Sequence, residues 1–87
     1  MKSIDVQVRQ PHGIHLRVAS AIVQMLKGFK SKVFISKDGK KAQADSVLEL
    51  VLLEATENSN VRVSAQGEDE DKAVKSLGEF FSDGAGI

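Results

Sequence analysis

Alternating and helix-spaced hydrophobic positions along the chain predict four strands and three helices. Ile4, Val6 and Val8 alternate with polar residues, which is typical of a strand with one buried face. Apolar side chains then recur at helical spacing in three stretches, which predicts helices at about 16–29, at about 47–53 and from the acidic run 68–71 onward. The remaining strands are predicted at 33–36, 41–44 and 61–65.

The resulting order, β-α-β-β-α-β-α, predicts an α+β fold in which helices cover one face of a four-stranded antiparallel sheet. The pattern alone also allows a ferredoxin-like arrangement of the same elements. We expect Gly28 to end the first helix, Asp38-Gly39 to form a hairpin turn, and an Asn within 57–60 to adopt the left-handed conformation. The last residues, 83–87, are expected to be frayed.

Length and charge limit the classes of function. The 87 residues predict a single domain, 1–87, that buries a modest core without disulfides, since the chain has no cysteine. Twelve basic and twelve acidic residues give zero formal charge, so no global field attracts nucleic acid or a membrane surface. No apolar run reaches membrane-spanning length. We therefore expect a cytoplasmic protein that binds neither nucleic acid nor membrane.

Residues 11–19, which read P-H-G-I-H-L-R-V-A, lie between the first predicted strand and the first predicted helix. The first turn of a helix presents free backbone N–H groups and a partial positive charge, which together favour a bound anion. His15 stands at this helix start, where Ser, Thr, Asp or Asn would be the usual cap. The helix dipole disfavours imidazolium, so we expect a neutral, nucleophilic ring near pH 7.

A phosphoryl group on this ring would be stabilised from several sides. The N–H groups of the first helical turn would face it, namely those of Leu16, Arg17 and Val18. The guanidinium of Arg17 would add a planar fork of donors, and Gly13 would permit close approach of the backbone and of a partner. Two simpler interpretations stay open: His15 is an ordinary surface residue, or it shares a metal ion with His12. Two imidazoles without a third ligand make an incomplete metal site, so we expect no metal and no other cofactor.

The family resemblance begins at residues 13–19, where this chain reads G-I-H-L-R-V-A and the HPr family reads G-L-H-A-R-P-A. HPr proteins are the histidine-containing phosphocarriers of the bacterial phosphoenolpyruvate-dependent sugar phosphotransferase system. The total length, the Asp45-Ser46 pair before an apolar segment, and the stretch V-R-V-S-A-Q-G-E-D-E at 61–70 resemble this family as well.

The resemblance implies an open-faced β-sandwich with strand order 1-4-2-3. It also implies that His15 accepts a phosphoryl group on Nδ1 from enzyme I and passes it to the A components of enzyme II, with Arg17 as the charge partner. The protein would then be a monomeric carrier, and not an enzyme that turns over a small substrate.

Three residues near His15 depart from the family pattern. Leu16 replaces the usual Ala and is expected to alter the fit of partners. Val18 replaces the usual Pro, which restores one backbone N–H near the phosphate position. His12 replaces a small Asn, Ser or Thr, so a second titratable ring is expected to modulate the rate and pH dependence of transfer.

Ser46 has two interpretations. With Glu49 it fits the S-x-x-E capping box, in which each side chain accepts a hydrogen bond from a free N–H at the helix start. The resemblance implies a rival role as the target of a regulatory serine kinase, as in many Gram-positive members. The helix dipole would favour a phosphate there, whereas Asp45 and Glu49 would repel it.

The predicted helix at 47–53 carries more apolar side chains than one core-facing stripe requires. Either this short helix is fully buried, or part of it forms an exposed docking patch. The family resemblance implies a docking surface on the first two helices, with Leu16, Ser20, Gln24, Val47, Leu48 and Val51 as its residues. Glu49 and Glu54 stand where the family commonly has Gly, so the choice of partner is expected to differ.

Two other classes of function stay open. One is a regulatory HPr-like binding module that acts by protein contact, without phosphorylation of His15. The other is a small phosphate-handling hydrolase, which would need a positioned water and a general base. The loop 11–19 offers no suitably spaced carboxylate for that role.

Overall fold

The computed structural model of the chain describes residues 1–86 and contains four strands and three helices. The strands are β1 (Lys2–Gln7), β2 (Lys32–Lys37), β3 (Lys40–Gln43) and β4 (Asn60–Gln66). The helices are α1 (Leu16–Leu26), α2 (Val47–Leu52) and α3 (Glu70–Ser82).

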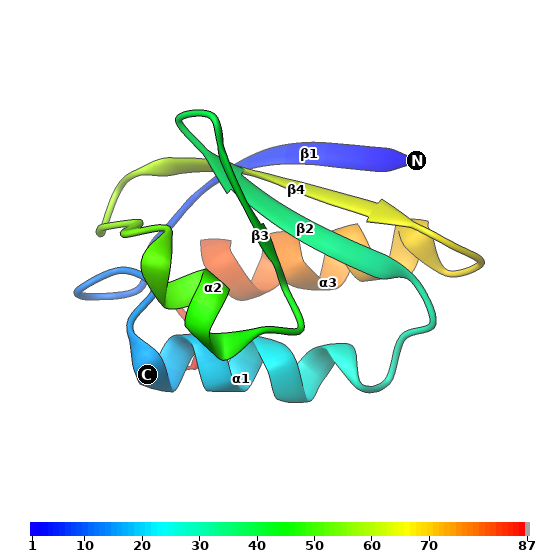
Figure 1. Cartoon of the computed structure of the whole chain (residues 1–87), viewed down its shortest axis with the longest axis horizontal. Helices are drawn as coiled ribbons and strands as arrows, with labels where there is room; N and C mark the ends of the chain where they lie inside the picture. Colours follow the sequence, from blue (N-terminus) through cyan, green and yellow to red (C-terminus); the bar gives the residue numbers. More distant parts are fainter. Residues whose placement is uncertain (87) are drawn as a thin grey trace.

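The strands form one antiparallel sheet in the order β1-β4-β2-β3. Val6 of β1 lies opposite Val61 of β4, and Ile35 of β2 lies opposite Val63. All three helices cover one face of the sheet and leave the other face open (Figure 1). The open-faced α+β sandwich and the strand order implied by the resemblance are therefore confirmed, in place of the ferredoxin-like alternative.

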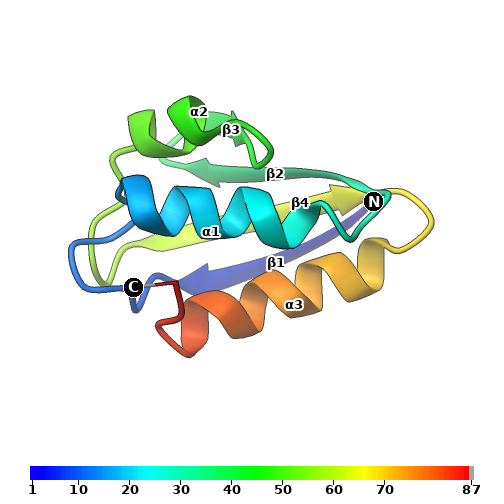
Figure 2. The ribbon, with the colours of Figure 1, turned by 90° about the horizontal axis from the view of Figure 1, so that it is seen from below.

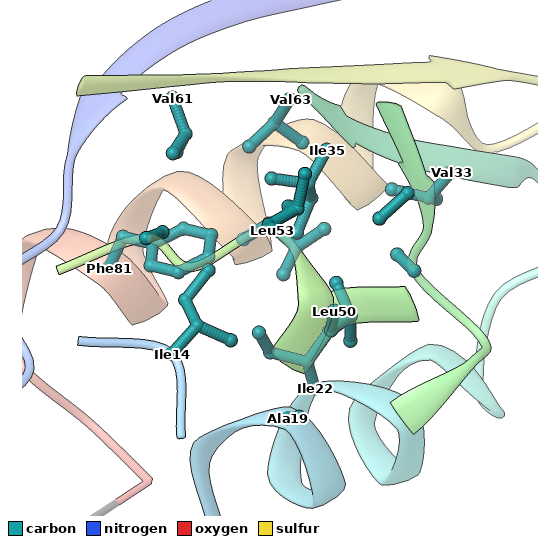
Figure 3. Close-up of a cluster of buried hydrophobic side chains, with 14 of the residues drawn as sticks. Ile14, Ala19, Ile22, Val33, Ile35, Leu50, Leu53, Val61, Val63 and Phe81 are labelled. Carbon is teal, nitrogen blue, oxygen red and sulfur yellow. The ribbon is translucent and has the colours of Figure 1, made fainter. Parts of the chain in front are cut away.

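The hydrophobic core lies between the helices and the covered face of the sheet (Figure 3). Its large side chains without exposed surface come from every layer, and include Ile22, Ile35, Leu50, Val63, Leu77 and Phe81. Burying each of these contributes roughly 1.5–3 kcal/mol. Ile14, from the loop before α1, is only 3% exposed and belongs to the same cluster. The core therefore also holds the loop that precedes His15.

The C-terminal end of α1 differs from the prediction. The α-helix ends at Leu26, and the next three N–H groups, of residues 27–29, donate to carbonyls three residues earlier. This tightened turn keeps Phe29 half-buried although the α-helix has ended. Gly28 does not adopt a left-handed φ, so it does not act as the expected C-terminal glycine.

The predicted turns are confirmed, whereas the predicted frayed tail is not. Asp38 and Gly39 both have positive φ, 50° and 83°, as a two-residue hairpin turn requires, and Asn58 has φ 72°. Residues 83–86 are held in place, because the Ala85 N–H donates to Phe80 O at 3.1 Å. The remaining residue of that prediction, Ile87, lies outside the described residues. Within residues 1–86, no helix has the length and apolar character needed to span a bilayer.

Candidate phosphoryl-accepting site

The loop between β1 and α1 is anchored on the segment that follows α2. Gly13 is buried with φ 72°, and a Cβ at this position would lie 2.0 Å from the carbonyl oxygen of Ala55. The next N–H, of Ile14, donates to the same oxygen at 2.9 Å. The glycine therefore permits close packing against this chain's own backbone, which fixes the approach to His15.

His15 is the N-cap residue of α1, with φ −92° and ψ −177°. Its Nδ1 accepts a hydrogen bond from the Arg17 N–H at 3.3 Å. An imidazole nitrogen thus does the work of the short oxygen-bearing side chain that usually caps a helix. The bond requires a lone pair on Nδ1 and aims it at the positive end of the helix. The half-exposed ring therefore presents an unprotonated nitrogen where an anion is favoured.

The first turn of α1 also carries unused donors. Within residues 1–86, the N–H groups of Leu16 and Val18 have no hydrogen-bond acceptor. The Arg17 side chain is exposed, and no acidic side chain of the described residues lies within ion-pair distance of it. The structure thus brings Leu16, Arg17 and Val18 together beside the His15 ring. Their free donors suit a phosphoryl group.

His12 lies at the surface, three residues before His15. It has φ 67° in a turn that the Gly13 N–H closes by donating to Gln10 O at 2.8 Å. A left-handed conformation is costly for a residue other than glycine or asparagine. In the described part of the chain, no three His, Cys, Asp or Glu side chains gather closely enough to hold a metal ion.

The capping box at α2 forms only in part. Ser46 Oγ accepts from the Glu49 N–H at 3.3 Å, as expected. Glu49 does not return the bond to Ser46. Its Oε1 accepts instead from the Gln43 N–H at 3.0 Å, while the Ser46 N–H donates to Gln43 O. The reason is that the chain turns at 43–46, which satisfies the Ser46 N–H locally and leaves the Gln43 N–H for the carboxylate.

The expected docking residues lie on two neighbouring helices, α1 and α2 (Figure 2). Leu16 is 66% exposed and Leu48 is 68% exposed. The other expected members are partly or fully exposed, namely Ser20, Gln24, Val47 and Val51. Leu50 and Leu53 face the core, but Leu48 is exposed on the same helix, so the interpretation of a fully buried α2 is wrong. We call the six expected docking residues the α1–α2 surface, namely Leu16, Ser20, Gln24, Val47, Leu48 and Val51.

Sequence reasoning missed two residues. Leu52 is 60% exposed and extends the apolar part of α2, which its i+4 spacing from Leu48 could have indicated. Gln10 is a fully buried polar residue just before the His15 loop. No pattern in the sequence points to Gln10, because its partners are backbone carbonyls near the other end of the chain.

Comparison with known proteins places this chain in a family. The family model for the PTS HPr component phosphorylation site matches residues 2–83. The phosphocarrier protein HPr of Buchnera aphidicola subsp. Baizongia pistaciae is 37% identical over 78 residues, covering 90% of this chain and 92% of the relative.

Solved structures agree with that match. HPr-C-His from Thermoanaerobacter tengcongensis is 31% identical with a TM-score of 0.93, over 100% of this chain and 98% of that one. Crh, the Bacillus subtilis catabolite repression protein, described as a domain-swapped dimer, is 37% identical with a TM-score of 0.78, over 97% of both chains. The sheet order, the histidine-capped helix and these matches together show that the chain belongs to the HPr phosphocarrier family of the phosphoenolpyruvate-dependent sugar phosphotransferase system.

Proposed function

We propose that this protein is a phosphoryl carrier that accepts a phosphoryl group on His15 Nδ1 from enzyme I and passes it to the A components of enzyme II. One observation carries the proposal: Nδ1 is an unprotonated acceptor that points at the N-terminus of α1. A nucleophilic lone pair and an anion site thus share one position.

The geometry supports a simple transfer step. The Nδ1 lone pair attacks phosphorus and forms an N–P bond, while the N–P bond in phosphorylated enzyme I breaks and its nitrogen keeps the electron pair. The Arg17 N–H, which donates to Nδ1 before the transfer, then donates to a phosphoryl oxygen. The free N–H groups of Leu16 and Val18 and the exposed Arg17 guanidinium supply further donors. In the next step the N–P bond at His15 breaks, Nδ1 keeps the electron pair, and a new bond to phosphorus forms on the enzyme II A component.

The α1–α2 surface is where enzyme I and the enzyme II A components would dock in turn. Its exposed apolar residues Leu16 and Leu48 follow the two cap residues, Leu16 directly after His15 and Leu48 two residues after Ser46. A carrier that meets several partners needs one shared surface of this kind. We infer a cytoplasmic monomer that presents this surface freely, and we infer that His12 modulates the pH dependence of transfer.

The test is incubation with phosphoenolpyruvate and enzyme I. A carrier gains one acid-labile phosphate, and the His15→Ala variant gains none. A hydrolase would instead release free phosphate from a phosphoester or an acyl phosphate unaided. Sedimentation of the unmodified protein gives its oligomeric state, and a dimer would contradict the inferred monomer.

A regulatory binding module is the second candidate, favoured by the similarity to Crh and by Leu16 in the docking surface. Such a module would gain no phosphate from enzyme I. Ser46 is a partly exposed residue, two positions before the exposed Leu48, and is the candidate target of a serine kinase. A phosphate on Ser46 would be stable in acid, so the same acid treatment separates it from phosphohistidine.

A further inference from the structure

Gln10 is the only polar or charged side chain among residues 1–86 that is buried, and it has no exposed surface. Its Nε2 donates to Phe80 O at 2.7 Å and to Ala85 O at 3.1 Å. Two carbonyl acceptors require two donors, which fixes the orientation of the amide group. Gln10 therefore binds the end of α3 and the segment that follows it.

The backbone of Gln10 belongs to the His15 loop. Its carbonyl accepts the Gly13 N–H at 2.8 Å, which closes the turn that contains His12. The His15 N–H in turn donates to Gly13 O at 3.1 Å. A short chain of bonds therefore runs from the Gln10 side chain to the residue that caps α1.

The end of α3 and residues 83–86 make further contacts at the same end of the molecule. The N–H of Arg9 donates to Phe81 O at 3.3 Å, so the chain that follows β1 is bound to the end of α3. Gly84 has φ 67°, and Gly86 lies so close to Phe80 and Ala21 that a Cβ would come within 2.6 Å of the Phe80 ring. Figure 2 shows this segment beside the end of β1 and the first half of α1.

A buried amide at position 10 stabilises the core less than an apolar side chain of the same volume would. Its Oε1 is buried and receives no hydrogen bond from any donor among residues 1–86, and an unpaired buried acceptor destabilises the folded state. Methionine would occupy a similar volume without this cost. What the amide adds is the pair of donated bonds, and these reach residues that lie 70 and 75 positions further along the chain.

We propose that Gln10 is a positioning residue that couples residues 83–86 to the His15 loop, so that this segment sets the rate at which His15 accepts a phosphoryl group. The proposal rests on the proposed function. Releasing the coupling lets the left-handed turn at His12 relax, and the Nδ1–Arg17 alignment is then populated for less of the time. Small losses of alignment reduce transfer strongly, because the reacting atoms must be held in place beforehand.

The test compares Gln10→Met with Val33→Ala. Gln10→Met keeps the volume and removes both donors. Val33→Ala weakens the core at a position across the cluster from Ile14 (Figure 3), so it controls for lost stability alone. We expect kcat/KM for phosphorylation by enzyme I to fall about tenfold in Gln10→Met and to stay unchanged in Val33→Ala. The His15 Nδ1 and Arg17 amide NMR signals should shift only in Gln10→Met.

The outcomes are distinct. Unchanged kcat/KM and unchanged NMR signals in Gln10→Met overturn the proposal and leave the phosphocarrier function intact. If enzyme I does not phosphorylate the wild type, the proposed function fails, and the NMR signals alone decide whether the coupling exists. If Gln10→Met does not fold, Gly84→Val replaces it, because a side chain at φ 67° displaces the segment from the other end. The same shifts and the same loss of rate are then expected.

Discussion

His15 uses the same nitrogen for structure and for the proposed chemistry. Nδ1 caps α1 through the Arg17 N–H, and Nδ1 is also the proposed phosphoryl acceptor. Asparagine is a preferred N-cap but cannot carry the phosphoryl group. The two roles can therefore be separated by one substitution.

We expect His15→Asn to match or exceed the wild type in free energy of unfolding, and to gain no phosphate from enzyme I. His15→Ala removes the cap as well, and should lose about 1 kcal/mol. Urea unfolding of the three proteins checks the structural part. Equal stability of the Ala and Asn variants would show that the Nδ1 bond contributes nothing to the helix.

Glu54 has φ 56°, a conformation that is costly for a side chain with a Cβ. Its only ion pair within the described chain joins Oε1 to Lys40 Nζ at 3.7 Å, and such exposed pairs contribute little. We expect Glu54→Gly to raise the free energy of unfolding by about 0.5–1 kcal/mol after the larger chain entropy of glycine is subtracted. Glu54→Ala, which keeps the Cβ and loses the ion pair, should not be stabilised in urea unfolding.

Between elements, Asp69 joins the start of α3 to the connection from α1 to β2. Its carboxylate accepts from the N–H groups of Lys30 and Ser31, both at 2.9 Å, and from the Ser31 hydroxyl. It occupies the N-cap position of α3 but makes no cap bond there. The Ser31 hydroxyl and the Lys30 N–H hold the pKa of Asp69 below its ordinary value of 3.8.

The lowered pKa of Asp69 determines how the free energy of unfolding changes with pH. Because the pKa of Asp69 is lower in the folded state, its bonds stabilise the fold fully above 3.8 and progressively less as pH falls through the folded-state pKa. We expect Asp69→Asn to unfold at lower urea concentration than the wild type at neutral pH, with the difference shrinking in acid. The control is Asp71→Asn, whose exposed carboxylate pairs only with Lys2 within the described chain. A difference that persists unchanged below the folded-state pKa would contradict the carboxylate's role.

Elements with local signals could be predicted from the sequence. Asp38-Gly39 dictates its own turn, and the spacing of Ile22 or Leu77 along a helix fixes which side faces the core. Interactions between distant segments could not be predicted. Gln10 reaches Ala85, and Asp69 leaves its own helix to bind Ser31, because the fold brings together residues that no local pattern relates.

In the candidate site, too, some features could be predicted from the sequence and others required the fold. The placement of His15 and Arg17 at a helix start follows from the alternation before them and the helical spacing after them. The capping bond to Nδ1 could not be inferred, since histidine is a poor cap in general. Direct packing of Gly13 on Ala55 also required the fold, because α2 and its exit segment had to be placed first.

For the molecule as a whole, all three helices lie on the same face of the sheet. Each helix packs its buried side against that face, so the outer sides of α1 and α2 are left for the proposed partners (Figures 1 and 2). Leu48 and Leu50 lie two residues apart on α2 with opposite exposure, 68% and 0%. One helix would therefore serve the proposed docking through Leu48 and the stability of the core through Leu50.

This contrast gives the last prediction, on docking. Leu48→Ser should change the free energy of unfolding by less than about 0.5 kcal/mol, whereas Leu50→Ala should lose about 2–5 kcal/mol through the cavity it leaves. If Leu48 contacts enzyme I, its loss weakens ground state and transition state alike, so KM should rise about five- to tenfold with kcat unchanged. Lys75→Ser, an exposed change on α3, is the matched control and should leave KM unaltered. A normal KM for Leu48→Ser would remove α2 from the proposed docking surface and leave the proposed chemistry at His15 untouched, because the residues of the candidate phosphoryl site belong to α1 and the loop before it.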